Sequence, residues 1–207
     1  MTSEEFHRWN TRFAHPDYVF GTAPNAFLAS CEPLLPEGGG RALAIADGEG
    51  RNGVFLAECG LDVLSVDFSP AAQEKARALA ASRGVTLATE IVDILAWNWP
   101  EASFDVVAAI FFQFCGAEGR ERIFAGLRRA LKPGGLLLLE GYRPEQIANG
   151  TGGPKTVENL YTRAILETAF GDFDDLDIRE YDAVLDEGSG HSGMSALIDL
   201  VGRRPRG

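Results

Sequence analysis

The sequence predicts an α/β protein built around a mainly parallel β-sheet, and two observations lead to this prediction. Short apolar runs with the length of a buried strand recur along the chain, as in Phe104 to Phe111. Segments of helical length, such as the alanine-rich stretch from Pro70 to Ser82, separate most of these runs. Strands that alternate with helices pair in parallel, because each helix returns the chain to the same end of the sheet.

The N-terminal residues predict helices rather than strands. Segments 3–13 and 25–35 have helical character and are joined by the turn-rich segment 15–21. The run Pro36-Glu37-Gly38-Gly39-Gly40 then forms a flexible lead into the first strand. We expect these helices to cap the sheet rather than to form a separate domain.

Later elements follow from apolar runs and from the residues that end them. Ser69 and Pro70 favour the start of a helix, and Lys132-Pro133-Gly134-Gly135 ends the helix expected at 118–131. The polar, glycine-rich segment 143–157 predicts a substrate loop, and a helix is expected at 158–170. The expected strands are 42–46, 61–66, 86–92, 104–111, 136–140, 174–185 and 195–203, the last two linked by a loop at 186–193.

The stretch from Arg41 to Pro70 predicts a nucleotide-binding β-α-β unit. Strand 42–46 leads into the turn Asp47-Gly48-Glu49-Gly50, and a helix starts near Asn52. Glycine suits such a turn, because a ligand can approach a backbone that has no Cβ. The next strand ends on Asp67, at the spacing of an acid that accepts hydrogen bonds from both hydroxyls of a ribose. The alternative is that the glycines and the acid only shape turns.

The charge balance excludes two classes of partner. The net charge of −11 repels nucleic acid and anionic membranes. No apolar run is long enough to span a membrane, and the acidic N-terminus MTSEEFHRWN lacks the pattern of a signal peptide. We therefore expect a cytoplasmic protein that acts on a small molecule. No exposed apolar stripe predicts a dimer.

The cysteines predict neither a disulfide framework nor a zinc site. Cys31, Cys59 and Cys115 are odd in number, widely separated and without His or Cys neighbours at metal-binding spacing. We expect them to be small core residues, and we expect no bound metal.

Several motifs resemble those of class I S-adenosylmethionine-dependent methyltransferases. The matching segments are ADGEGRNG with LSVDFSP, the pair Asp93-Ile94, FDVVAAIFFQF and LRRALKPGGLLLLEGY. The resemblance as a whole covers roughly residues 40 to 203. The resemblance implies a Rossmann-like, doubly wound sheet, mostly parallel and seven-stranded, with an antiparallel strand in a C-terminal hairpin. It also implies S-adenosyl-L-methionine as the cofactor.

Within this family, GEGRN and the upstream RWNTRFAHPDYVFGTAPNAFL resemble the tellurite-resistance and thiopurine S-methyltransferase-like branch. Members of that branch methylate small, soft nucleophiles, so the resemblance implies a thiol or a chalcogen oxyanion as the methyl acceptor. We expect one domain over 1–207, with the helical cap at 1–38, a cofactor-binding core at 39–141, and the substrate loop, helix and hairpin at 142–207.

The resemblance also assigns cofactor contacts. It implies Gly48 and Gly50 against the methionine part, Asp67 on the ribose, Phe68 beside the adenine, Asp93 and Ile94 at the adenine edge, and Ile110 near the sulfonium. The further cofactor candidates are Asp47, Arg51, Asn52, Gln113, Trp9 and Arg12.

The first loop departs from the family pattern. Ala44 stands where the family usually has an acid, and Ala46 stands where it has its first glycine. Asp47 takes the place of a small residue. We expect the Asp47 carboxylate to hold the ammonium group of the cofactor instead.

Contacts to the acceptor are expected where strand ends and the cap converge. The candidates are Trp9, Arg12, Tyr18, Asn25, Gln113, Tyr142, Arg143 and His191, of which His191, Tyr142 and Arg143 are the catalytic candidates. His191, in the late loop, could act as a general base, or it could be a solvated loop residue. Arg143 could pair with an anionic acceptor or form a surface ion pair. A thiolate needs no base, whereas a hydroxyl or amine acceptor does.

Two other functions fit part of the pattern. An NAD-linked oxidoreductase also uses a glycine loop and an acid such as Asp67, but Asn52-Gly53 breaks the spacing of its third glycine. A catalytically silent module that binds the cofactor and regulates a partner is the second alternative, and Ala44 favours it.

Overall fold

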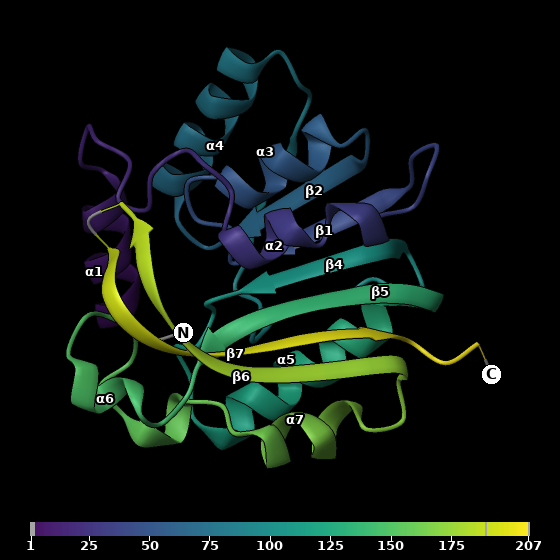
Figure 1. Cartoon of the computed structure of the whole chain (residues 1–207). Helices are drawn as coiled ribbons and strands as arrows, with labels where there is room; N and C mark the ends of the chain where they lie inside the picture. The colour runs from purple at the N-terminus through teal and green to yellow at the C-terminus, as the bar shows by residue number, and fades with distance from the viewer. Residues whose placement is uncertain (1–2, 189, 207) are drawn as a thin grey trace.

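A seven-stranded sheet forms the centre of the molecule, with the strand order β3-β2-β1-β4-β5-β7-β6 (Figure 1). The computed structural model describes residues 3–188 and 190–206, so the expected domain range and the predicted loop at 186–193 include residues outside this description. Strand β7 is antiparallel to both of its neighbours, and the other pairs are parallel. This arrangement confirms the predicted Rossmann-like sheet with an antiparallel strand in the C-terminal hairpin.

The strands lie near their predicted positions. They are β1 (Arg41–Ile45), β2 (Asp62–Asp67), β3 (Ala88–Ile91), β4 (Phe104–Ile110), β5 (Leu131–Tyr142), β6 (Asp174–Glu187) and β7 (His191–Arg203). Strand β5 begins earlier than predicted, because the expected turn at 132–135 is a bulge between two pairs of the β4–β5 ladder. The loop predicted at 186–193 is also wrong over much of its length, because β6 extends to Glu187, which pairs with His191 at the start of β7.

The helices are shorter than predicted in two places. They are α1 (Ser3–Phe13), α2 (Ala26–Ser30), the 3-10 helix η1 (Glu32–Leu34), α3 (Arg51–Glu58), α4 (Pro70–Arg83), α5 (Ala117–Ala130), α6 (Gln146–Asn149), the 3-10 helix η2 (Val157–Asn159) and α7 (Arg163–Phe170). The helix expected at 25–35 is split at Cys31, because Pro33 has no N–H to continue the α-helical ladder. The helix expected at 158–170 begins only after Thr162, whose side chain accepts a hydrogen bond from the Ile165 N–H.

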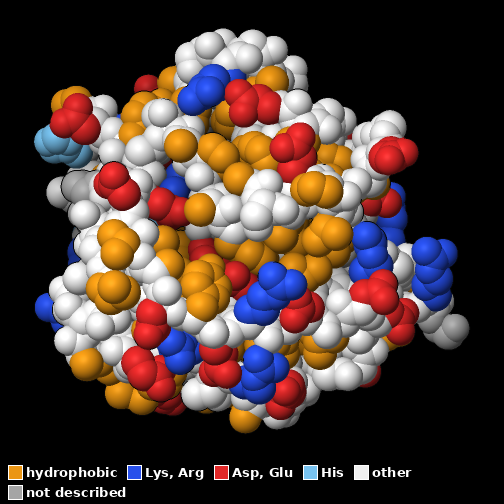
Figure 2. All heavy atoms as spheres, in the orientation of Figure 1, with side chains coloured by type: hydrophobic (Ala, Val, Ile, Leu, Met, Phe, Trp, Pro, Cys, Tyr) orange, Lys and Arg blue, Asp and Glu red, His pale blue; other side chains and the backbone are white. Residues whose placement is uncertain are grey.

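Two hydrophobic clusters cover the two faces of the sheet. Side chains alternate between the faces of a strand, so Leu43 of β1 packs with α5 and α7, whereas Ala42 packs with α2 and α3. On the face that bears α2, hydrophobic side chains gather between charged ones (Figure 2). A second cavity of about 750 Å³ lies there, lined in part by Phe27, Leu34 and Asp199. None of the described helices has the length and apolar character needed to cross a membrane.

The tip of the β6–β7 hairpin packs against the segment that follows α1. The Gly190 N–H donates a 3.0 Å hydrogen bond to the Val19 carbonyl oxygen. A Cβ at position 190 would lie 2.2 Å from the Phe20 ring, so this close approach requires glycine. The contact brings the C-terminal hairpin and the N-terminal cap together over the strand ends. The boundaries expected between cap, core and C-terminal part stay predictions.

Ser69 caps α4 as predicted and also ties α4 to α1. Its hydroxyl accepts a 3.2 Å hydrogen bond from the Ala72 N–H and donates a 2.7 Å hydrogen bond to the Asn10 side-chain oxygen. We expect Ser69→Ala to lower the free energy of unfolding by about 1 to 2 kcal/mol, measured by urea denaturation. Ser82→Ala in the same helix is the control, with an expected change within about 0.5 kcal/mol. Equal losses in both variants would contradict the capping role.

Candidate active site

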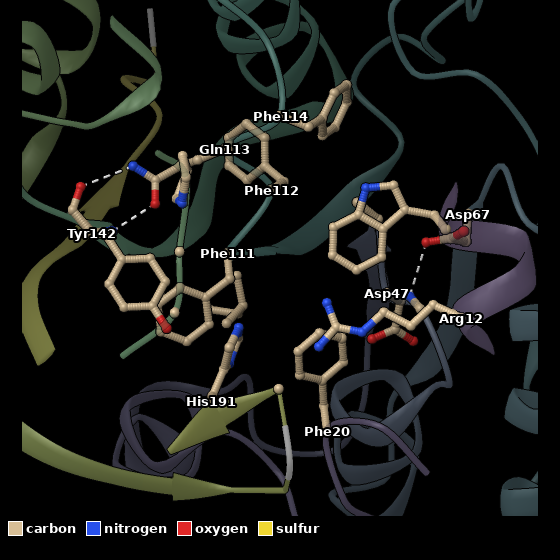
Figure 3. Close-up of a pocket in the computed structure, with 18 of the residues that line it drawn as sticks. Arg12, Phe20, Asp47, Asp67, Phe111, Phe112, Gln113, Phe114, Tyr142 and His191 are labelled. Atoms are coloured by element: carbon tan, nitrogen blue, oxygen red, sulfur yellow. Dashed lines mark hydrogen bonds between the residues drawn. The ribbon is translucent and has the colours of Figure 1, made fainter. Parts of the chain in front are cut away.

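A cavity of about 640 Å³ lies at the carboxyl ends of β1, β2, β4 and β5, and residues of α1 and of the β6–β7 hairpin also line it (Figure 3). This volume is in the range of small-molecule sites, and such crevices are the usual ligand sites of open α/β sheets. The predicted site residues that line it are Trp9, Arg12, Asp47, Gly48, Arg51, Asn52, Asp67, Phe68, Ile110, Gln113, Tyr142 and His191. Gly50, Asp93, Ile94 and Arg143 do not line it.

The glycine loop and Asp67 form one hydrogen-bonded unit. The Asp67 carboxylate accepts hydrogen bonds from the Gly48 N–H at 3.0 Å and the Ser69 N–H at 2.8 Å. Burial raises the pKa of Asp67 to about 6, although these N–H groups oppose the shift. The unit therefore fixes a buried carboxyl group at the end of β2, with oxygen lone pairs left for a ligand.

Asp47 is buried at the start of the same loop. Its carboxylate accepts hydrogen bonds from the Ser65 hydroxyl at 2.7 Å and from the Gly53 N–H at 3.2 Å. Burial raises the pKa of Asp47 to about 7, against the effect of these hydrogen bonds. A cationic ligand group beside Asp47 would favour its ionised form.

Three residues of the predicted cofactor set lie away from the cavity. A Cβ at Gly50 would lie 2.5 Å from the Cβ of Ala76, so this glycine allows α3 and α4 to pack closely. Ile94 is buried in the hydrophobic core, and the Asp93 carboxylate accepts a hydrogen bond from the Leu95 N–H at 3.0 Å. Local packing and turn formation account for these three positions.

Two non-glycine residues with left-handed backbone lie at the cavity. Ala46 follows β1 with a φ of 45°, and Phe111 follows β4 with a φ of 52°. This conformation costs roughly 1–2 kcal/mol for a residue with a Cβ, and such strain clusters at functional sites. Ala46 stands where the resembled family has a glycine, which adopts this backbone without strain.

Arg12 lies at the mouth of the cavity between two aromatic rings. Its guanidinium carbon is 5.2 Å from the centroid of Trp9 and 5.2 Å from that of Phe20. Across residues 3–188 and 190–206, Arg12 forms no ion pair. The pKa of Arg12 is lowered, first by burial and then by the charge of Arg8. The guanidinium group stays protonated in spite of this shift. An unpaired cation on two aromatic faces suits an anionic group.

His191 is the first residue of β7 rather than a loop residue, and it is only 9% exposed. The solvated alternative is therefore wrong. Its ring centroid lies 4.5 Å from those of Phe20 and Phe111 and 5.8 Å from that of Tyr142. Figure 3 shows the imidazole projecting between these rings. Burial lowers the pKa of His191, so the neutral form dominates near pH 7.

Gln113 and Tyr142 lie side by side in the wall of the cavity. The Gln113 side-chain NH2 group donates a 2.9 Å hydrogen bond to the Tyr142 carbonyl oxygen (Figure 3). The Tyr142 N–H donates a 2.6 Å hydrogen bond to the Gln113 side-chain oxygen. Gln113 therefore positions the end of β5. Arg143 points the other way, because successive residues alternate sides, and pairs with Asp182 at 2.5 Å. Its position supports the surface ion pair and not the expected contact with an acceptor.

Two acceptor candidates have other partners. The Tyr18 hydroxyl donates to the Lys75 carbonyl oxygen at 3.2 Å. The Asn25 side chain caps α2 through the Leu28 N–H and donates to the carboxylates of Glu140 and Glu187.

Sequence reasoning missed Phe20, Phe111 and Glu187 as parts of the site. The first two line the cavity beside His191, and Glu187 lies behind it. Phe111 belonged to an apolar run that predicts core, and Glu187 to a predicted loop. Only the pairing of β6 with β7 reveals that Glu187 faces His191. The described part of the chain contains no group of three or more His, Cys, Asp and Glu side chains that could hold a metal ion.

The comparison with protein families supplies the decisive observation for this site. Residues 42–135, from β1 to the bulge of β5, match the model of the family described as Methyltransferase domain. The chain contains an S-adenosyl-L-methionine-dependent methyltransferase domain. The cofactor of this methyltransferase domain is S-adenosyl-L-methionine, and the matched range includes the glycine loop, Asp67 and β4.

The known proteins similar to this chain have low sequence identity to it. Hemagglutinin 1 of Eikenella corrodens is 29% identical over 135 residues, which cover 65% of this chain and 44% of that protein. The chain thus spans less than half the length of this curated relative. One similar solved structure comes from work on the conversion of a disulfide bond into a thioacetal group during echinomycin biosynthesis. Its TM-score is 0.74 at 19% sequence identity, and the match covers 98% of this chain and 94% of that chain. The structure of TehB from Haemophilus influenzae has a TM-score of 0.72 and 20% sequence identity, and the match covers 88% of this chain and 63% of the TehB chain.

Proposed function

We propose that the protein transfers the methyl group of S-adenosyl-L-methionine to a small acceptor whose nucleophile is a thiol or a chalcogen oxyanion. The observation that carries this proposal is the unpaired guanidinium of Arg12 at the mouth of the cavity, in a chain with a net charge of −11. A protein so acidic has no general need to attract anions. A cation placed in this cavity therefore favours an acceptor with negative charge.

The residues of the cavity fit the cofactor. Asp67 would accept hydrogen bonds from the ribose hydroxyls, and the bare backbone at Gly48 would lie against the methionine part. Phe68 offers an aromatic face to the adenine, and Asp47 a carboxylate to the ammonium group. When bound, the cofactor supplies an electrophilic methyl group on a sulfonium. The rate then depends largely on how the chain orients the nucleophile for in-line attack.

The chemistry of one structural neighbour points in the same direction. The structure with the TM-score of 0.74 concerns the conversion of a disulfide bond into a thioacetal, which is chemistry at sulfur. The aromatic rings of Phe20, Phe111 and Tyr142 make the acceptor side of this cavity polarisable and apolar. Such surroundings favour a soft nucleophile over a strongly hydrated one.

Calorimetric titration tests the cofactor, and an acceptor screen tests the reaction. We expect S-adenosyl-L-methionine and its demethylated product to bind, and NAD not to bind. The screen follows methyl transfer to small mercaptocarboxylates, neutral thiols and selenite. Binding without transfer to any acceptor would leave the silent regulatory module as the better function. Absence of binding would overturn the assigned site.

Arg12→Gln separates a role toward the acceptor from one toward the cofactor. We expect the KM for a mercaptocarboxylate to rise about tenfold, because the variant loses one charged contact at a partly exposed position. The affinity for the demethylated cofactor should not change. Arg122→Gln removes a cation that pairs with Glu118 on the surface of α5 and should change neither value. A loss of cofactor affinity in Arg12→Gln would instead place Arg12 on the cofactor carboxylate.

A further inference from the structure

The end of the C-terminal hairpin places a carboxylate behind the cavity histidine. Glu187, the last residue of β6, pairs with His191, the first residue of β7. One Glu187 oxygen lies 3.6 Å from the His191 Nδ1 atom. The two side chains are 9% and 11% exposed, so water screens their interaction weakly.

Three donors fix the Glu187 carboxylate in this position. Arg51 donates to one oxygen at 2.6 Å, and the Asn25 side chain and the Ala26 N–H each donate to the other at 3.1 Å. Burial alone would raise the pKa of Glu187, but His191 and Arg51 outweigh it and lower the pKa to about 2. Glu187 is therefore ionised near neutral pH.

The two nitrogens of His191 have different surroundings. Nδ1 is buried and has no hydrogen-bond partner within the described residues, and the Glu187 carboxylate lies beside it. The contact of 3.6 Å is longer than a hydrogen bond, and such contacts in empty active sites shorten when substrate binds. A carboxylate beside Nδ1 favours the tautomer with the proton on Nδ1. The lone pair of Nε2 is then available on the opposite side of the ring, and the ring lines the cavity.

Charged groups from three elements act on this imidazole. Glu187 of β6 favours its protonated form, whereas Arg51 of α3 and Arg12 of α1 disfavour it. Tyr142 of β5 contacts the ring edge and is neutral, because burial raises the pKa of its hydroxyl. The imidazole is a free base near neutral pH and has a carboxylate that stabilises it once it accepts a proton.

We propose that His191 is the general base of the transfer and that Glu187 is the residue that positions it, so that the acceptor is a thiol that enters with its proton. This inference rests on the proposed function. The thiol proton moves to Nε2, and the electron pair on the acceptor sulfur forms the bond to the methyl carbon. The pair of the broken carbon–sulfonium bond stays on the cofactor sulfur, and His191 releases its proton to water. A chalcogen oxyanion would need no such base.

The pairing can be tested on the empty protein by nuclear magnetic resonance of the imidazole nitrogens. We expect the Nδ1–H tautomer in the wild type, and a downward shift of the His191 titration midpoint in Glu187→Gln. Glu180→Gln, the same change on the same strand, removes a carboxylate that pairs with Arg163 on the surface and should leave the midpoint unchanged. An unchanged midpoint in Glu187→Gln would overturn the positioning role. If that variant does not fold, Glu187→Asp serves for the same measurement.

The role as a base can be tested with acceptors of graded acidity. Thiophenols are largely ionised near neutral pH, alkyl thiols are not, and selenite needs no deprotonation. We expect His191→Asn to lower kcat for alkyl thiols by roughly 10² to 10⁴, the usual contribution of a general base, and to affect thiophenols much less. Glu187→Gln should show the same selectivity, and Glu187→Asp should restore part of the rate.

The outcomes separate this inference from the proposed function. Equal losses for all acceptors, with normal binding of the demethylated cofactor, would show that His191 only shapes the cavity and would overturn the inference. Methyl transfer to selenite but to no thiol would also overturn it, while the proposed function would stand. If the wild type methylates no acceptor, the proposed function fails, and the resonance experiment still decides whether Glu187 positions His191.

Discussion

Replacing Asp67 by alanine will weaken cofactor binding by about 1.5–3 kcal/mol, the range for hydrogen bonds to a charged group. This corresponds to a roughly 10- to 150-fold higher Kd for the demethylated cofactor, measured by calorimetric titration. Asp67 is 3% exposed and is held by the N–H groups of Gly48 and Ser69, so its carboxylate is fixed in place for the proposed contact with the ribose. The same change frees the Gly48 N–H and loosens the loop.

Asp62→Ala is the matched control for this prediction. Asp62 begins the same strand, is exposed, and pairs with Arg41 at 3.5 Å outside the cavity. We expect its Kd to equal that of the wild type. Unchanged affinity in Asp67→Ala would remove Asp67 from the cofactor site and would also undermine the pose in which Gly48 contacts the methionine part.

Replacing Asp47 by asparagine will stabilise the empty protein at pH 8. The pKa of Asp47 is about 7 in the folded protein, mainly because of burial, against an ordinary value of 3.8. The folded state therefore binds the proton more tightly than the unfolded state does. The stability from this group is complete below pH 3.8 and is lost as the pH rises to 7. Above that pH the ionised carboxylate costs up to about 4 kcal/mol, on the order of 1.4 kcal/mol per pKa unit.

Urea denaturation at pH 5 and pH 8 checks this prediction. Asparagine keeps an acceptor for the Gly53 N–H and never ionises, so the variant should gain more stability at pH 8 than at pH 5. The same variant should bind the cofactor more weakly, because it lacks the carboxylate proposed for the ammonium group. Ser195→Ala is the control, because Ser195 lies in β7, away from this loop, and the substitution removes no titratable group. Its effect on stability should be the same at both pH values. A gain that does not depend on pH would refute the ionisation argument.

Short-range patterns in the sequence predicted the glycine loop that lines the cavity and most of the helices and strands. The turn from Asp47 to Gly50 begins where an apolar strand ends, and Asp67 ends the next strand, so both positions follow from short-range patterns. Ser69 and Pro70 likewise fixed the start of α4, because capping depends on residues within one turn. Element ends were less predictable where β5 bulges and where β6 and β7 extend into the range expected to be a loop.

The sequence by itself determined the α/β sheet, the order of its strands and helices, and the carboxylate at the end of β2, since all of these depend on neighbours along the chain. The tertiary structure alone decided that Glu187 faces His191, that Arg143 pairs with Asp182, and that Gly50 serves helix packing. The first two contacts depend on strand register and on the face of the sheet to which a side chain points, and a shift of one residue reverses both. The third depends on how closely α3 and α4 pack. The proposed acceptor side of the cavity is built from such contacts between distant segments, whereas the proposed cofactor side is built mainly from one continuous stretch.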